Sequence, residues 1–121
     1  GGTRDLVRLL KAWQSHRGVP ISSVALEWLA IDSLVDWEHE RDGSRYYDWM
    51  VRDAFVHIDR DHSDIIEIPD TGEHLTIGTA WRPLARVARD HAVKACECEA
   101  EGRDRDAWWE WEKIFGDAVP L

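Results

Sequence analysis

RLLKAW, residues 8–13, is the stretch from which the fold of this chain can be worked out. In and just before it, Leu6, Leu10 and Trp13 recur at i, i+4 and i+7. Residues with this spacing lie on one side of a helix and form an apolar stripe. The spacing predicts a helix over residues 4–16.

A second helix is predicted to begin at SSVALE, residues 22–27, after the helix breakers Gly18 and Pro20. The two serines stand where a helix needs side-chain acceptors for its unpaired N–H groups. From Ser22 to about Glu38, apolar residues nearly surround the helix, which is typical of a buried helix. We therefore expect this helix to be the central and most buried one.

Lys11 and Ser23 together form a candidate phosphate-binding corner. Lys11 precedes the end of the first helix by about one and a half turns, and Ser23 opens the second helix. If the helices fold back on each other, the ammonium and the helix N-terminus come within roughly 8 Å, given a rise of about 1.5 Å per residue. That geometry binds phosphate. The alternative is that the serine merely caps the helix and the lysine is merely solvated.

The remaining chain predicts three more helices and one irregular segment. Residues 59–82 are the least helical part and contain good turn chemistry in Pro-Asp-Thr-Gly at residues 69–72. Asp104 is the expected cap of the last helix. The predicted fold is all-α, a compact bundle of about five helices with an irregular segment or small hairpin between the third and fourth, in a single domain over residues 1–121. The three further helices are predicted at residues 44–58, 83–101 and 104–116.

Composition describes a soluble globular domain with an acidic surface. The chain is 44% hydrophobic and 32% charged, with a net charge of -9. General nucleic-acid binding is not expected, because such domains gather Lys and Arg on a basic face. No apolar run approaches the roughly 20 residues of a membrane span, and no signal-peptide pattern is present. We therefore expect no membrane partner and a cytoplasmic location.

Cysteine and tryptophan usage add two expectations. Cys96 and Cys98 form a lone C-x-C with no second pair, so reduced thiols on a helix are favoured over zinc or a disulfide. The chain has eight tryptophans, more than one small core can bury entirely, so some should face another lobe or chain. They are Trp13, Trp28, Trp37, Trp49, Trp81, Trp108, Trp109 and Trp111.

Three segments resemble the C-terminal helical lobe of the cGAS/DncV-like nucleotidyltransferases (CD-NTases), relatives of oligoadenylate synthetase. They are RLLKAW at residues 8–13, VPISSVALEWLA at residues 19–30, and AVKACECEAEGRDRDAWWEWEKIFGDAVP at residues 92–120. Since both ends of the chain match, the resemblance spans nearly all of it. The resemblance implies an all-helical lobe separated from the core lobe that carries the catalytic metal ligands.

The resemblance also implies a function and a set of contacts. Enzymes of this family make cyclic or linear oligonucleotide second messengers from nucleoside triphosphates, as in bacterial anti-phage signalling. By resemblance, Lys11 and Ser23 touch the triphosphate of the donor nucleotide, Arg8 faces the nucleotide more loosely, and Ser22 is a weaker candidate. The implied partners are the nucleotidyltransferase core lobe and nucleoside triphosphates, with Mg2+ bound by the core lobe and not by this chain. The chain alone is expected to be inactive.

Carboxylate motifs within the chain do not supply the missing metal site. Gly43-Ser44 and Asp59-Arg60-Asp61 imitate the glycine-serine turn and D-x-D of nucleotidyltransferases, but helical periodicity lies between them where a strand is needed. Asp104-Arg105-Asp106 is the start of a helix. A cluster of possible metal ligands is packed too densely in one probable turn and is better interpreted as solvated. It comprises His57, Asp59, Asp61, His62 and Asp64.

Two alternatives from other functional classes stay open. Arg86 to His91 fits R-x-x-x-x-H, the pattern of HEPN ribonucleases, and Arg52 to His57 fits it as well. With six histidines and many arginines in the chain, such matches also arise by chance. The second alternative is a noncatalytic helical module whose exposed tryptophans bind a partner protein.

Overall fold

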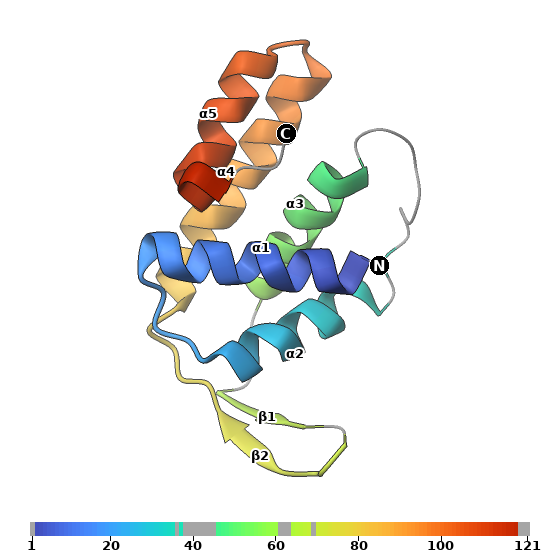
Figure 1. Cartoon of the computed structure of the whole chain (residues 1–121), viewed down its shortest axis with the longest axis vertical. Coiled ribbons are helices and arrows are strands. Elements are labelled where there is room, and N and C mark those ends of the chain that lie inside the picture. The colour runs from blue at the N-terminus through green and yellow to red at the C-terminus, as the bar shows by residue number, and fades with distance from the viewer. Residues whose placement is uncertain (1, 36, 38–45, 61–63, 69, 119–121) are drawn as a thin grey trace.

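The computed structural model describes residues 2–35, 37, 46–60, 64–68 and 70–118, and its elements form a helical bundle with one small hairpin (Figure 1). The predicted all-α class is confirmed, and so is the hairpin between the third and fourth helices. The elements are α1 (Gly2–Arg17), α2 (Ser23–Leu34), α3 (Tyr46–Ile58), β1 (Ile65–Glu67), β2 (His74–Thr76), α4 (Arg82–Ala100), α5 (Asp104–Phe115) and the 3-10 turn η1 (Gly116–Ala118).

The helices α1, α3 and α5 meet in an aromatic centre. Trp13 of α1 packs edge-on against Phe55 of α3 with ring centroids 5.2 Å apart. Phe55 in turn lies 6.2 Å from Phe115 of α5. All three rings are buried, and burying a side chain of this size stabilises a fold by about 1.5–3 kcal/mol. The stripe predicted around RLLKAW is therefore the one that holds the bundle together.

The helix α4 packs closely on α3 and α5 because its buried face consists mainly of alanine. Ala85, Ala88, Ala92 and Ala95 are all buried, and small side chains let two helix backbones approach each other. In Figure 1, α4 and α5 form an antiparallel hairpin that extends away from α2 and the strands. Pro83 stands in the first turn of α4, as predicted, where its missing N–H is of no consequence.

The helix α2 is not the central helix of the bundle, contrary to our prediction. Leu26 and Leu29 are fully buried, but Val24, Ile31 and Val35 are 50%, 55% and 68% exposed. Because α2 lies at the edge of the bundle (Figure 1), only one side of an almost wholly apolar helix meets α1 and α3. Periodicity shows that all sides of α2 are apolar, but it cannot show which side has a neighbour.

The ends of two helices also differ from prediction. The helix α2 ends at Leu34 instead of near residue 38, and Trp37 beyond it donates its indole N–H to Asp53 Oδ2 of α3 at 2.8 Å. The residue at the cap position of α5 is Arg103, with no side-chain cap hydrogen bond, so Asp104 is the first helical residue and not the cap. An acidic residue is still favourable there because it faces the positive end of the helix dipole.

The irregular segment forms a two-stranded antiparallel hairpin in which Ile66 pairs with Leu75. Ile66 is buried and its neighbour Ile65 is exposed, as expected for alternating strand residues. The predicted turn contains Gly72, whose φ of 69° is one that L side chains rarely adopt and whose amide donates to the Ile68 carbonyl oxygen at 2.8 Å. Pro69 lies outside the described residues.

Cysteine and tryptophan placement agree with the sequence. Cys96 and Cys98 are buried free thiols on α4, and burial raises the pKa of the Cys96 thiol to about 12. Trp108 and Trp109 on α5 are exposed, whereas Trp13, Trp81 and Trp111 are buried. Within the residues that the structure describes, no helix is long and apolar enough to span a membrane.

Candidate functional site

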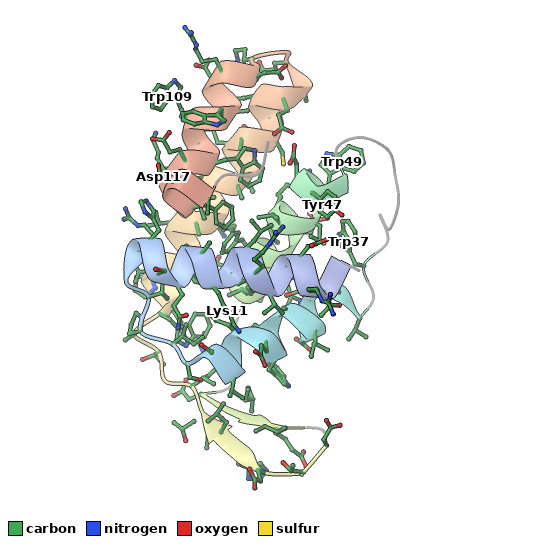
Figure 2. The ribbon with its side chains drawn as sticks, in the orientation of Figure 1. Lys11, Trp37, Tyr47, Trp49, Trp109 and Asp117 are labelled. Atoms are coloured by element: carbon green, nitrogen blue, oxygen red, sulfur yellow. The ribbon has the colours of Figure 1, made fainter. Side chains whose placement is uncertain are left out.

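Lys11 and the first turns of α2 lie side by side, as the spacing of the two segments predicts. The Lys11 ammonium lies 3.1 Å from Glu27 Oε1, and Glu27 is one helical turn beyond Ser23. Figure 2 shows Lys11 between α1 and α2, on the side of the molecule away from Trp109 and Asp117. The structure therefore brings the lysine to the N-terminal half of α2, where Glu27 is its ion-pair partner.

The N-terminus of α2 is capped by Ser22, not by Ser23. Ser22 has extended backbone angles, and its hydroxyl accepts a hydrogen bond from the Ala25 amide at 3.2 Å. The first helical hydrogen bond runs from the Leu26 amide to the Ser22 carbonyl oxygen. The amides of Ser23 and Val24 precede that bond, so they belong to the unpaired N–H groups at the positive end of the helix.

Ser23 itself is exposed as the first residue of α2. Its side chain is not used for capping, in contrast to that of Ser22. Both serines are exposed, and the hydroxyl of Ser22 is the one that accepts a capping hydrogen bond.

The loop between α1 and α2 is held by a residue that sequence reasoning missed. The side-chain amide of Gln14 donates a hydrogen bond to the Ile21 carbonyl oxygen. The backbone carbonyl oxygen of Gln14 accepts one from the Val19 amide at 3.0 Å. Val19 and Ile21 are buried, and Gly18 has a φ of 60°. These bonds fix where α2 starts relative to α1. The sequence alone did not predict this role, because a glutamine one turn before a Gly-x-Pro break is not a recognised motif.

Arg8 lies on α1 and pairs with a residue of its own helix. Its guanidinium lies 3.8 Å from Asp5 of the same helix, and its side chain is 75% exposed. Arg8 and Lys11 are three residues apart and therefore share one side of α1. Arg8 adds positive charge near the corner formed by Lys11 and Ser23 without being held there.

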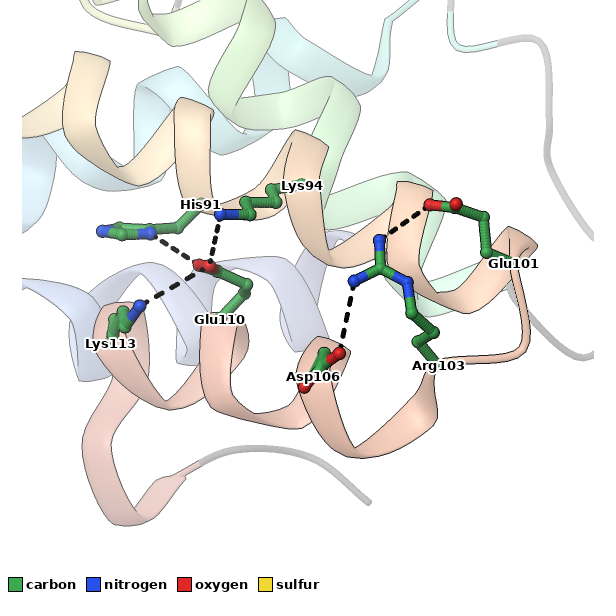
Figure 3. A network of polar contacts seen from close by, with 7 residues as sticks. All are labelled: His91, Lys94, Glu101, Arg103, Asp106, Glu110 and Lys113. Carbon is green, nitrogen blue, oxygen red and sulfur yellow. Dashed lines mark hydrogen bonds and ion pairs between the residues drawn. The ribbon is translucent and has the colours of Figure 1, made fainter.

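A second group of basic residues surrounds the buried carboxylate of Glu110 on α5 (Figure 3). The carboxylate lies 2.9 Å from His91 Nδ1, 3.7 Å from the Lys94 ammonium and 3.5 Å from the Lys113 ammonium. Burial alone, the largest single influence, would raise the pKa of Glu110. The hydrogen bond from His91 and the charges of Lys113 and Lys94 together lower that pKa below its ordinary value.

A groove of about 650 Å³ adjoins this group where α1, α4 and α5 meet. Its basic residues are accompanied by the carboxylates of Glu112 and Asp117. The last turn of α1 and the end of α5 both reach the groove, so helix carbonyl ends add negative potential. Two of its basic residues, His91 and Lys113, already pair with Glu110. Its lining comprises His16, Arg17, His91, Trp109, Glu112, Lys113, Gly116 and Asp117.

Arg86 and His91 do not share a site within the chain. Arg86 pairs with Asp59 at 3.3 Å, alongside Arg89 at 2.6 Å, whereas His91 bonds to Glu110. Five residues along a helix rotate a side chain by about 140°, from 3.6 residues per turn, so the two groups face different sides of α4. Nothing in this arrangement places the two groups together on one scissile bond.

The second R-x-x-x-x-H pair is likewise divided. Arg52 pairs with its neighbour Asp53 at 2.8 Å, while His57 Nε2 lies 2.6 Å from Asp32 Oδ2 on α2. The hydrogen bond to Asp53 is the main cause that raises the pKa of Arg52. His57 thus ties α3 to α2, whereas the ion pair of Arg52 with Asp53 lies within α3.

Metal coordination has no support in the described part of the chain. Among residues 2–35, 37, 46–60, 64–68 and 70–118, no group of three or more His, Cys, Asp or Glu could hold a metal ion. Asp61 and His62 of the proposed cluster lie outside these residues, as do Gly43 and Ser44.

Comparison with known proteins gives no name to this arrangement. The chain matches no family model, no curated protein and no solved structure.

Proposed function

We propose that this chain is the C-terminal helical lobe of a CD-NTase-type nucleotidyltransferase and that its α1–α2 corner contacts the triphosphate of the donor nucleotide. The α1–α2 corner means Lys11 together with Ser22 and Ser23 at the start of α2. The observation that supports the proposal is the position of the Lys11 ammonium, 3.1 Å from a carboxylate one turn into α2 and on the exposed surface.

The chemistry of the corner suits phosphate oxygens. A lysine ammonium is a compact charge with three donors, and it can bind phosphate oxygens from several directions. The first turn of α2 adds amide donors at the positive end of the helix dipole. Lys11 is 44% exposed, so a triphosphate can reach it without a change in the packing of α1 on α2.

In this proposal the chain binds and orients the triphosphate and does not perform the chemistry. In this proposal the carboxylates that hold Mg2+ belong to the core lobe. Within the two-lobed enzyme, nucleoside triphosphates are joined into cyclic or linear oligonucleotides. The hydroxyl of Ser23 and the ammonium of Lys11 hold the donor phosphates while the core lobe acts on them.

The test is the affinity of the chain for inorganic tripolyphosphate and ATP, measured by calorimetric titration at low ionic strength. We expect weak binding, because the contacts of the core lobe are missing, and a severalfold loss of affinity in Lys11→Ala. Arg105→Ala is the matched control, since it removes one exposed positive charge at the start of α5. Equal affinity of Lys11→Ala and the wild type, or synthesis of oligonucleotides by the chain alone with Mg2+, would contradict the proposal.

A second candidate function, protein interaction, is favoured by the exposed face of α2. Val24, Ile31 and Val35 are exposed and Trp28 is half-buried, and their spacing of four, three and four residues places them in one stripe. Monomers rarely leave such a stripe on the surface without a partner. Ile31→Glu should abolish association with a separately supplied nucleotidyltransferase core lobe if the stripe is the lobe contact. Binding to an unrelated protein instead would favour an independent interaction module.

A further inference from the structure

We propose that Glu27 is a competing counter-ion for Lys11, occupying the ammonium until the triphosphate displaces it and thereby setting the affinity of the α1–α2 corner. This inference rests on the proposed function, because it concerns the same lysine. Glu27 would then be a residue that regulates the site without itself binding phosphate.

The first argument is the exposure of the pair. The side chains of Lys11 and Glu27 are 44% and 49% exposed, and their charged atoms are 3.1 Å apart. Exposed pairs of this kind contribute little to stability, because water solvates each partner nearly as well when they separate. The lysine can therefore exchange its carboxylate for a phosphate at small cost, and the fold does not depend on the pair.

The second argument is that the carboxylate cannot move far when the lysine leaves it. Glu27 belongs to α2, and its neighbours Leu26 and Ala25 are fully buried against the rest of the bundle. After the exchange, the backbone of Glu27 therefore stays where it is, and the carboxylate can move only as far as its own side chain reaches. It therefore both competes for Lys11 and repels the ligand, and the two effects act in the same direction.

The third argument is the contrast with nearby charges on α1. Arg8 pairs with Asp5 of its own helix at 3.8 Å. Lys11, by contrast, pairs across the helix junction with Glu27 of α2. In a chain with a net charge of -9, one neutralised lysine makes the corner unattractive to weakly charged anions. A ligand must bring several negative charges close to Lys11 to replace the carboxylate.

The effect of removing the charge follows from Coulomb's law. A unit charge a few ångströms from a phosphate, largely in water, changes its affinity by about threefold to tenfold. Glu27→Gln keeps the size and shape of the side chain but removes the charge. We expect it to bind inorganic tripolyphosphate about threefold to tenfold more tightly than the wild type at low salt, and the advantage to shrink at high salt as screening increases.

The experiment is a double-mutant cycle on the full chain, with inorganic tripolyphosphate as the probe. The variants are Glu27→Gln, Lys11→Ala and the two combined. Because part of the effect passes through Lys11, the gain from Glu27→Gln should be smaller in the Lys11→Ala background. Glu97→Gln is the matched control, since it removes one exposed carboxylate from α4, and its affinity should differ from wild type by less than about twofold.

The outcomes separate this inference from the function on which it rests. If Lys11→Ala does not weaken binding, the proposed triphosphate contact is wrong, whatever Glu27→Gln does. If Lys11→Ala weakens binding but Glu27→Gln leaves it equal or weaker, the contact stands and the competing role of Glu27 is wrong. Circular dichroism of each variant confirms that the helical fold is retained, as expected for an exposed pair.

Discussion

Basic residues occur in two different environments in this molecule, one exposed and one around a buried carboxylate. At the α1–α2 corner, Lys11 pairs with the exposed carboxylate of Glu27, one turn into α2. Around Glu110, three basic groups converge on a carboxylate whose side chain is 7% exposed, near two helix ends that carry negative potential. On our proposal, exposure and the nearest helix end, rather than residue type, decide which group accepts an outside anion.

The largest expected effect is on the buried group. Glu110→Ala should lower the free energy of unfolding by about 2 kcal/mol, because a buried, hydrogen-bonded carboxylate is lost and His91 loses its partner. The cost is held down because Lys94 and Lys113 are more than half exposed and can return to water. Urea denaturation measures the change. An unchanged urea concentration at the unfolding midpoint would contradict the structural role that we assign to Glu110.

An intermediate effect is expected on the pH dependence of stability. The folded pKa of Glu110 lies below its unfolded value of 4.5, so its contribution is fully present above that value and is lost as pH falls through the folded pKa. Urea denaturation between about pH 6 and pH 3 should therefore show a smaller loss of stability in Glu110→Gln than in the wild type. Parallel pH profiles for the two proteins would contradict the sign that we assign.

The smallest effect is expected at the α1–α2 corner. Glu27→Gln should change the free energy of unfolding by less than about 1 kcal/mol, because exposed ion pairs contribute little. The measurement is again urea denaturation, beside Glu110→Ala. A loss at Glu27 as large as that at Glu110 would mean that the two groups are alike, and the comparison between them would fail.

Much of the fold could be predicted from residue spacing alone. The stripe of Leu6, Leu10 and Trp13 is buried, and the Pro-Asp-Thr-Gly turn joins two strands. Apolar periodicity predicts such elements because burial of one face stabilises them locally. It could not reveal that α2 lies at the edge of the bundle, since that depends on which neighbours cover it.

The candidate site was predictable in part. The approach of Lys11 to α2 follows from two helices joined by a short break, and it was expected. The cap at Ser22 instead of Ser23 depends on where the backbone becomes helical, which periodicity fixes only within a few residues. His91 and Lys94 lie 19 and 16 positions from Glu110 and on a different helix, so no local sequence pattern predicts these contacts.

The most direct test of the central claim is to map which backbone amides respond to tripolyphosphate by NMR. The proposal predicts that the largest chemical-shift changes fall at residues 22–26 and at Lys11, and that they shrink in Lys11→Ala. Changes centred on His91 and Lys113 instead, and unaffected by Lys11→Ala, would place the anion at the other basic group and contradict the proposal.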